Sequence, residues 1–278
     1  MTTATTPADL TAELNARRPG FNRLLIAEWT KIRSVRSTIW TLLLFIIVTI
    51  GFTTLFMALT EAQWNKQDDS QKASIIADPM GSILGSGLFL GQLTICVLGC
   101  LVITSEYSTG MIRASLLAVP RRVPMLAAKA IVFAVVVFSV GLVVSFVSFF
   151  IGQAILHAHV SVSLSQPGVA RAVIGADLFL TVLGLFALAI GAIVRHSAGA
   201  ITTVIGFVLV LAPLAQLLPG SLGKHVHAFL PSEAGHSIVE LHKAKDDILS
   251  PWQGFGVFCA WTALLMIIAI VLLRRRDA

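Results

Sequence analysis

Six long apolar runs, separated by shorter polar segments, dominate the pattern of this 278-residue chain. A helix rises about 1.5 Å per residue, so runs of this length reach about 28–39 Å and can cross the hydrocarbon core of a bilayer. The pattern therefore predicts an all-α polytopic membrane protein. The predicted spans are Thr38–Leu59, Ile83–Thr104, Leu126–Ile151, Val173–Val194, Ala200–Leu218 and Trp252–Leu273.

The segment before the first span has a different pattern. Residues 1–19 are rich in Thr, Ala and charge, which predicts a disordered tail. In residues 20–37, apolar residues recur at helical spacing and Arg or Lys occupies the rest of the helical wheel. This predicts a basic amphipathic helix in the headgroup layer, or alternatively an extension of the first span. Residues 38–278 form the six-span domain.

The polar segment Pro219–Pro251, between spans five and six, is expected to contain a helix at Ser232–Lys245. Ser232 would cap it and Glu233 would lie in its first turn. Such a helix would rest on the outer membrane face or dip into it. Within span five, Pro213 predicts a kink.

Composition supports the membrane class and charge predicts the orientation. The chain is 56% hydrophobic and 12% charged, with a mean hydropathy of +0.88, which excludes an ordinary soluble domain. With the N-terminus inside, 14 Lys and Arg residues lie in inner segments and 6 in outer segments. We therefore expect a multi-pass protein of the cell membrane with both termini cytoplasmic. The net charge of +6 reflects this topology rather than nucleic-acid binding.

The polar segment Ser105–Pro124, between spans two and three, has an amphipathic middle. Residues Thr109–Val119 can form about three helical turns. Two interpretations are open: a short loop on the membrane surface, or a docking helix for a soluble partner. The apolar positions near one face are Met111, Ile112, Leu116 and Val119.

This segment resembles the corresponding one in type-2 permeases of ATP-binding cassette (ABC) exporters. There, Glu-Tyr-x-x-Gly-Thr-x-Arg precedes a Pro-x-Arg turn and a Lys that opens span three. Met111 stands where the family usually has Thr. The matching residues are Glu106, Tyr107, Gly110, Arg113, Leu117, Pro120, Arg121, Arg122 and Lys129.

The resemblance implies an N-terminal elbow helix, a cytoplasmic coupling helix between spans two and three, and an outer re-entrant helical segment between spans five and six. It also implies a separate nucleotide-binding ATPase subunit and a second permease subunit, identical or paralogous. The residues it assigns to partner docking are Glu106, Gly110, Met111, Ile112, Arg113, Leu116 and Leu117.

No nucleotide-binding loop of the Gly-x-x-x-x-Gly-Lys-[Ser/Thr] type occurs in the sequence. We therefore expect no catalysis and no cofactor in this chain, with ATP and Mg²⁺ bound by the partner subunit. The spans hold little charge: Asp177 is near the outer end of span four, and Lys129 is near the inner end of span three, where it can snorkel. This argues against an ion-coupled carrier.

Polar and small residues in span two are further candidates. Gln92 could line a cargo path or bond a neighbouring helix. The four-residue spacing within Gly81/Gly85 and within Gly87/Gly91 permits close helix packing, inside one subunit or between two. The outer histidines could bind metal, but no His-Glu-x-x-His motif occurs, so no metal site is expected.

The function expected from the resemblance is export of an amphipathic or apolar cargo, such as a drug, antibiotic, peptide or lipid, driven by a partner's ATP hydrolysis. A membrane scaffold without transport is the first alternative. A membrane metal-dependent hydrolase is the second.

Overall fold

The computed structural model describes residues 20–111, 122–241 and 248–275, and every regular element in these ranges is helical. The six predicted spans are each confirmed as a helical segment long and apolar enough to cross a membrane, with bounds that differ by a few residues. The predicted tail and residues 112–121 of the docking segment lie outside the described ranges. The helices long and apolar enough to cross a membrane are α3 (Arg36–Ala62), α5 (Pro79–Ser108), α7 (Arg122–Leu156), α8 (Val169–Val194), the run Ser197–Gln216, and α13 (Pro251–Arg275).

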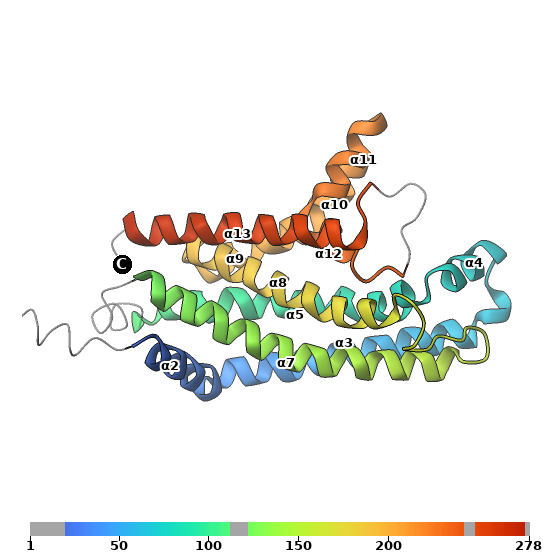
Figure 1. Ribbon diagram of the computed structural model, residues 1–278, viewed down its shortest axis with the longest axis horizontal. Helices are drawn as coiled ribbons and strands as arrows, with labels where there is room; N and C mark the ends of the chain where they lie inside the picture. The colour runs from blue at the N-terminus through green and yellow to red at the C-terminus, as the bar shows by residue number, and fades with distance from the viewer. Residues whose placement is uncertain (1–19, 112–121, 242–247, 276–278) are drawn as a thin grey trace, which may run out of the picture.

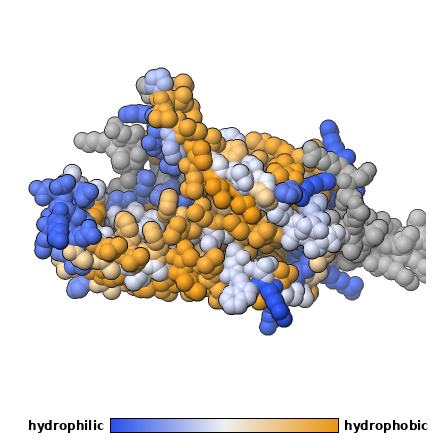
Figure 2. All heavy atoms as spheres, turned by 180° about the vertical axis from the view of Figure 1, so that it is seen from behind, coloured by the Kyte–Doolittle hydropathy of each residue, from blue (hydrophilic) through white to orange (hydrophobic). Residues whose placement is uncertain are grey.

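The long helices lie side by side (Figure 1). The predicted interfacial helix, α2 (Phe21–Ser34), lies at one end of the bundle, and α4 (Asp69–Ala77) lies at the other. We name these the α2 end and the α4 end. Figure 2 shows hydrophobic side chains across the middle of one face and hydrophilic ones toward both ends, as a bilayer-spanning protein requires.

Helix α8 is the centre of the bundle and packs against α5, α7 and α13. Glycines allow this close packing. A Cβ on Gly99 of α5 would lie 2.9 Å from the Cβ of Ala187, and one on Gly184 would lie 2.7 Å from the ring of Phe133 in α7. Without a hydrophobic driving force between helices in lipid, such close backbone contact supplies much of the association energy.

Span five is irregular, as Pro213 predicts. It consists of α9 (Ser197–Ile205), a π-helical stretch at Gly206–Val210, and α10 (Leu211–Gln216). Proline lacks an N–H and its ring crowds the carbonyl four residues earlier, here that of Leu209. The wider π turn accommodates this conflict immediately before the proline.

The predicted helix at Ser232–Lys245 is wrong in its extent. Helix α12 covers only Pro231–His236 and is followed by turns, while residues 242–247 lie outside the described ranges. Leu230 is its N-cap, with Pro231 in the first helical position, so Ser232 does not cap it. Glu233 does lie in the first turn.

Two further helices were not expected from the sequence. Helix α11 (Gly220–Phe229) precedes α12 and projects away from the bundle (Figure 1). The polar segment after α3, expected as a loop, contains a 3-10 turn at Trp64–Lys66 and then α4.

Candidate functional site

Four charged side chains from three helices meet at the α2 end. Glu28 and Lys31 come from α2, Glu106 from α5 and Lys129 from α7. The Nζ of Lys129 lies 2.5 Å from Oε2 of Glu28 and 2.8 Å from Oε1 of Glu106. The Nζ of Lys31 lies 2.8 Å from Oε1 of Glu28 and 3.1 Å from Oε1 of Glu106. We call these four residues the charge cluster.

The charge cluster is buried but electrically balanced. The side chains of Lys129, Glu28 and Glu106 are 2%, 5% and 6% exposed, and that of Lys31 is 28% exposed. Burial alone would lower the pKa of Lys31, but its hydrogen bond to Glu28 and the nearby charge of Glu106 raise that pKa above its ordinary value. Lys31 therefore stays protonated at neutral pH, and two positive charges compensate two negative ones.

Neither Lys31 nor Glu28 was among the site residues predicted from the sequence, and of these two Glu28 is the buried one. Glu28 shares the buried face of α2 with Leu24 and Ile32, at i, i+4 and i+8. An acidic residue on the apolar face of a surface helix is a signal that a buried cation faces it. Lys129, near the start of span three, is that cation.

The structure gives new surroundings to Glu106, a predicted docking residue, and to Lys129, a residue of the family pattern. Glu106 lies in the last turn of α5, and its Oε1 pairs within the chain. It is therefore not exposed to pair with a basic residue of a partner. Lys129 was expected to snorkel, but its Nζ is buried because two carboxylates accept its hydrogen bonds.

Gly110 and Met111 mark the end of α5. Gly110 has a φ of +71°, which favours glycine, and its N–H donates to the carbonyl of Tyr107. Gly110 thus terminates the helix, and Met111 beyond it is 44% exposed. The remaining predicted docking residues lie outside the described ranges: Ile112, Arg113, Leu116 and Leu117.

Two cavities are lined by the α10–α12 segment, and one of them also borders the bundle. The first, about 300 Å³, is lined by α5, span five and α12 and includes Gln92 and Gly85. The second, about 580 Å³, lies beside α11. Both are lined by Gln216, His227 and Glu233, so these three side chains form a partition between them.

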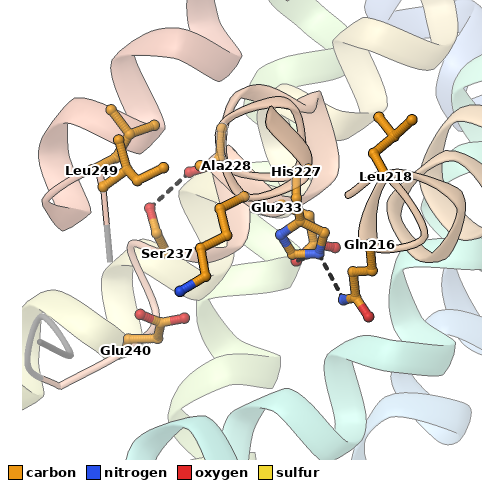
Figure 3. Close-up of a pocket in the computed structure, with 12 residues that line it drawn as sticks. Gln216, Leu218, His227, Ala228, Glu233, Ser237, Glu240 and Leu249 are labelled. Carbon is orange, nitrogen blue, oxygen red and sulfur yellow. Dashed lines mark hydrogen bonds and ion pairs between the residues drawn. The ribbon is translucent and has the colours of Figure 1, made fainter. Parts of the chain in front are cut away.

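The partition is held by polar contacts. In Figure 3 the side chains of Gln216 and His227 point toward each other, and their Nε2 atoms are 2.9 Å apart. The Nε2 of His227 also lies 3.6 Å from Oε2 of Glu233. These contacts join the end of span five to α11 and α12.

The four glycines of the predicted packing motif have different surroundings. A Cβ on Gly87 would lie 2.8 Å from the carbonyl oxygen of Thr49, and one on Gly91 would lie 3.3 Å from the ring of Phe45. Both therefore pack against α3 of the same chain. Gly81 lies in the first turn of α5, where its N–H donates to the carboxylate of Asp78. Gly85 faces the first cavity.

The histidines and acids of the described ranges do not assemble into a metal site: no group of three or more His, Cys, Asp or Glu side chains could hold an ion there. His159 instead stacks on Trp64 and contacts Glu61 at 3.2 Å. Asp177 is fully buried against Gly141 of α7, with neither carboxylate oxygen hydrogen-bonded in the described chain.

A scan against models of protein families found no match to this chain, and a search of curated proteins found none either. The fold and composition define the class: an all-helical, polytopic membrane protein whose described residues include six helices long and apolar enough to cross a membrane.

Proposed function

We propose that this chain is the transmembrane permease subunit of an ATP-driven ABC exporter. Its cargo is amphipathic or apolar, and the energy comes from a separate nucleotide-binding subunit. The observation that carries the proposal is the charge cluster, because it lies at the base of the segment whose sequence resembles the family's coupling helix.

The charge cluster provides a route for mechanical coupling. Glu106 lies five positions before Met111, at the point where α5 leads into the docking segment. Through Lys129 and Lys31, Glu106 connects this point to α7 and α2. Separating buried, paired charges is costly, so a push on the docking segment moves three helices together rather than one.

Helix α5 extends this route to the cavities. It carries Glu106 near one end and Gln92 fourteen positions earlier, about 21 Å away along a helix axis. Gln92 lines the first cavity, whose walls combine apolar side chains of α5 and span five with polar ones from α10, α11 and α12. Both cavities have volumes typical of small-molecule sites. Movement of α5 would change the shape of the first cavity and the contacts of its partition. In the proposed mechanism, this movement switches access to the cavity between the two sides of the membrane.

The proposed assembly contains other subunits. Since the sequence has no nucleotide-binding loop, ATP hydrolysis belongs to a partner. A second permease, identical or paralogous, completes the transport unit. The proposed orientation places the α2 end in the cytoplasm of the cell membrane. A cysteine at Asp69 on α4 should then react with a membrane-impermeant reagent added outside, and one at Arg275 on α13 should not.

The test uses the chain purified with its ATP-hydrolysing subunit and reconstituted in vesicles. Ile112→Asp should reduce ATP-dependent uptake of an amphipathic dye at least tenfold, with the variant still inserted normally. Ile76→Asp is the matched control: Ile76 is 55% exposed on α4, at the opposite end, and its substitution should leave uptake unchanged.

Two results would contradict the proposal. In the first, no ATP-hydrolysing subunit copurifies. In the second, a complex forms but hydrolysis never drives uptake, which is the outcome the scaffold alternative predicts. Full coupling in Ile112→Asp would place the docking site elsewhere.

A further inference from the structure

An apolar groove lies on the outside of the bundle, between α2 and α7, at the α2 end. Its volume is about 290 Å³, and all of its lining residues are hydrophobic. Trp29 is 49% exposed and Ile26 is 65% exposed. The groove residues are Leu25, Ile26 and Trp29 of α2 and Ile131, Val132 and Val135 of α7.

The ion pair between Glu28 and Lys129 fixes the width of this groove. Glu28 is adjacent in sequence to Trp29 in one wall, and Lys129 is two residues before Ile131 in the other. Their contact at 2.5 Å is buried, so α2 cannot slide or roll to close the groove without breaking it. The groove therefore stays open as long as this ion pair holds, and its apolar walls favour an apolar occupant.

The charge around the groove indicates which occupant fits. Glu28 is the only acidic residue of α2, and it is buried and paired, so the exposed surface of α2 carries positive charge alone. Arg33 lies one helical turn beyond Trp29 on the same face and is exposed. It is placed where the phosphate of a lipid would lie when its acyl chain enters the groove.

We propose that this groove binds an anionic phospholipid of the leaflet at the α2 end, with an acyl chain between α2 and α7 and the phosphate on Arg33. A second copy of this chain would be a poorer occupant, because two exposed positive α2 surfaces would repel each other. The proposal requires only that the chain spans a bilayer, so it stands or falls independently of the exporter proposal.

Trp29 provides a direct probe of this site. The full chain is reconstituted in phosphatidylcholine vesicles containing an equal, low fraction of either brominated phosphatidylglycerol or brominated phosphatidylcholine, since bromine quenches a tryptophan that it touches. Subtracting the signal of Trp29→Phe isolates this residue from the other four tryptophans. The anionic lipid should quench Trp29 about fivefold more effectively, the preference expected for one basic residue near the membrane surface.

Two arginine variants distinguish a specific lipid site in the groove from general attraction of anionic lipid to a positively charged protein. Arg33→Gln should abolish the preference for the brominated anionic lipid. Arg275→Gln is the matched control, because it removes the same charge from an exposed position on α13 at the same end. It should leave the preference intact.

Three outcomes would overturn the proposal. Equal quenching by both brominated lipids would mean that the groove holds ordinary surrounding lipid. Weak quenching by both would mean that protein, such as a second copy, covers it. An equal loss of preference in both arginine variants would mean that net charge, and not the groove, attracts the lipid.

Discussion

Replacing Lys129 with methionine tests the charge cluster most directly. Methionine keeps an unbranched side chain of similar length but removes the ammonium group that binds Glu28 at 2.5 Å and Glu106 at 2.8 Å. The substitution leaves two buried carboxylates facing a single cation, Lys31. We expect a strong loss of stability with little change in packing.

The size of the expected loss of stability follows from the burial of the ion pairs that Lys129 makes. Removing one partner of a buried ion pair typically costs about 3–5 kcal/mol, because an uncompensated charge remains. Lys31 already contacts both carboxylates and is partly exposed, so the cost should lie at the lower end, about 3 kcal/mol. At the ~2–4 °C per kcal/mol typical of large soluble domains, the melting temperature should fall by about 6–12 °C.

The assay is thermal unfolding of the purified protein in detergent, followed by intrinsic fluorescence. Adding Glu28→Gln to Lys129→Met leaves one carboxylate and one ammonium, so the double variant should recover more than half of the loss. Lys31→Met is the matched control, because it removes the same charge from a side chain that is 28% exposed, and its effect should be smaller.

The reasoning would be refuted if the Lys129→Met protein had the same melting temperature as the wild type. It would also fail if Glu28→Gln added a further loss in the Lys129→Met background, because the carboxylates would then not depend on Lys129 for compensation.

Two further predictions concern packing and pH. Gly87→Leu should lower the melting temperature, because its side chain would collide with Thr49 of α3, whereas Gly51→Leu on α3, where a Cβ meets nothing within 4 Å, should be neutral; equal melting of both variants would contradict this. Burial lowers the pKa of His236 in α12 below its ordinary 6.5, although Glu233 and Asp78 partly oppose the shift. The unfolded chain then binds a proton that the folded chain does not, so stability should fall as pH drops below 6.5, by at most about 1.4 kcal/mol per pH unit. In His236→Gln the melting temperature between pH 7 and 5 should vary less than in the wild type, and an identical profile would contradict the assignment.

The six long apolar segments and the amphipathic helix α2 could be predicted from sequence because the signals that specify them are local. A bilayer selects apolar runs by length, so α3 and α7 are recognisable without knowing their neighbours. Periodicity likewise indicates α2, since an amphipathic surface helix needs only one apolar face. The irregularity before Pro213 follows from the same kind of reasoning, because the clash lies within one turn of helix.

The charge cluster depended on the tertiary structure. Glu28 and Lys129 are 101 residues apart. No local sequence pattern reveals that α2 packs on α7 at the position that brings these two side chains into contact. The sequence indicated Glu106 as a docking residue, but it lies in the last turn of α5, where Lys129 and Lys31 pair with it inside the bundle. Whether Gly87 packs against its own chain or a second one was equally open, until the position of Thr49 decided it. The length of an apolar run is a property of a single segment, so it can be read from the sequence of that segment alone. Charge pairing and close contact depend on which helices become neighbours, and only the tertiary structure decides that.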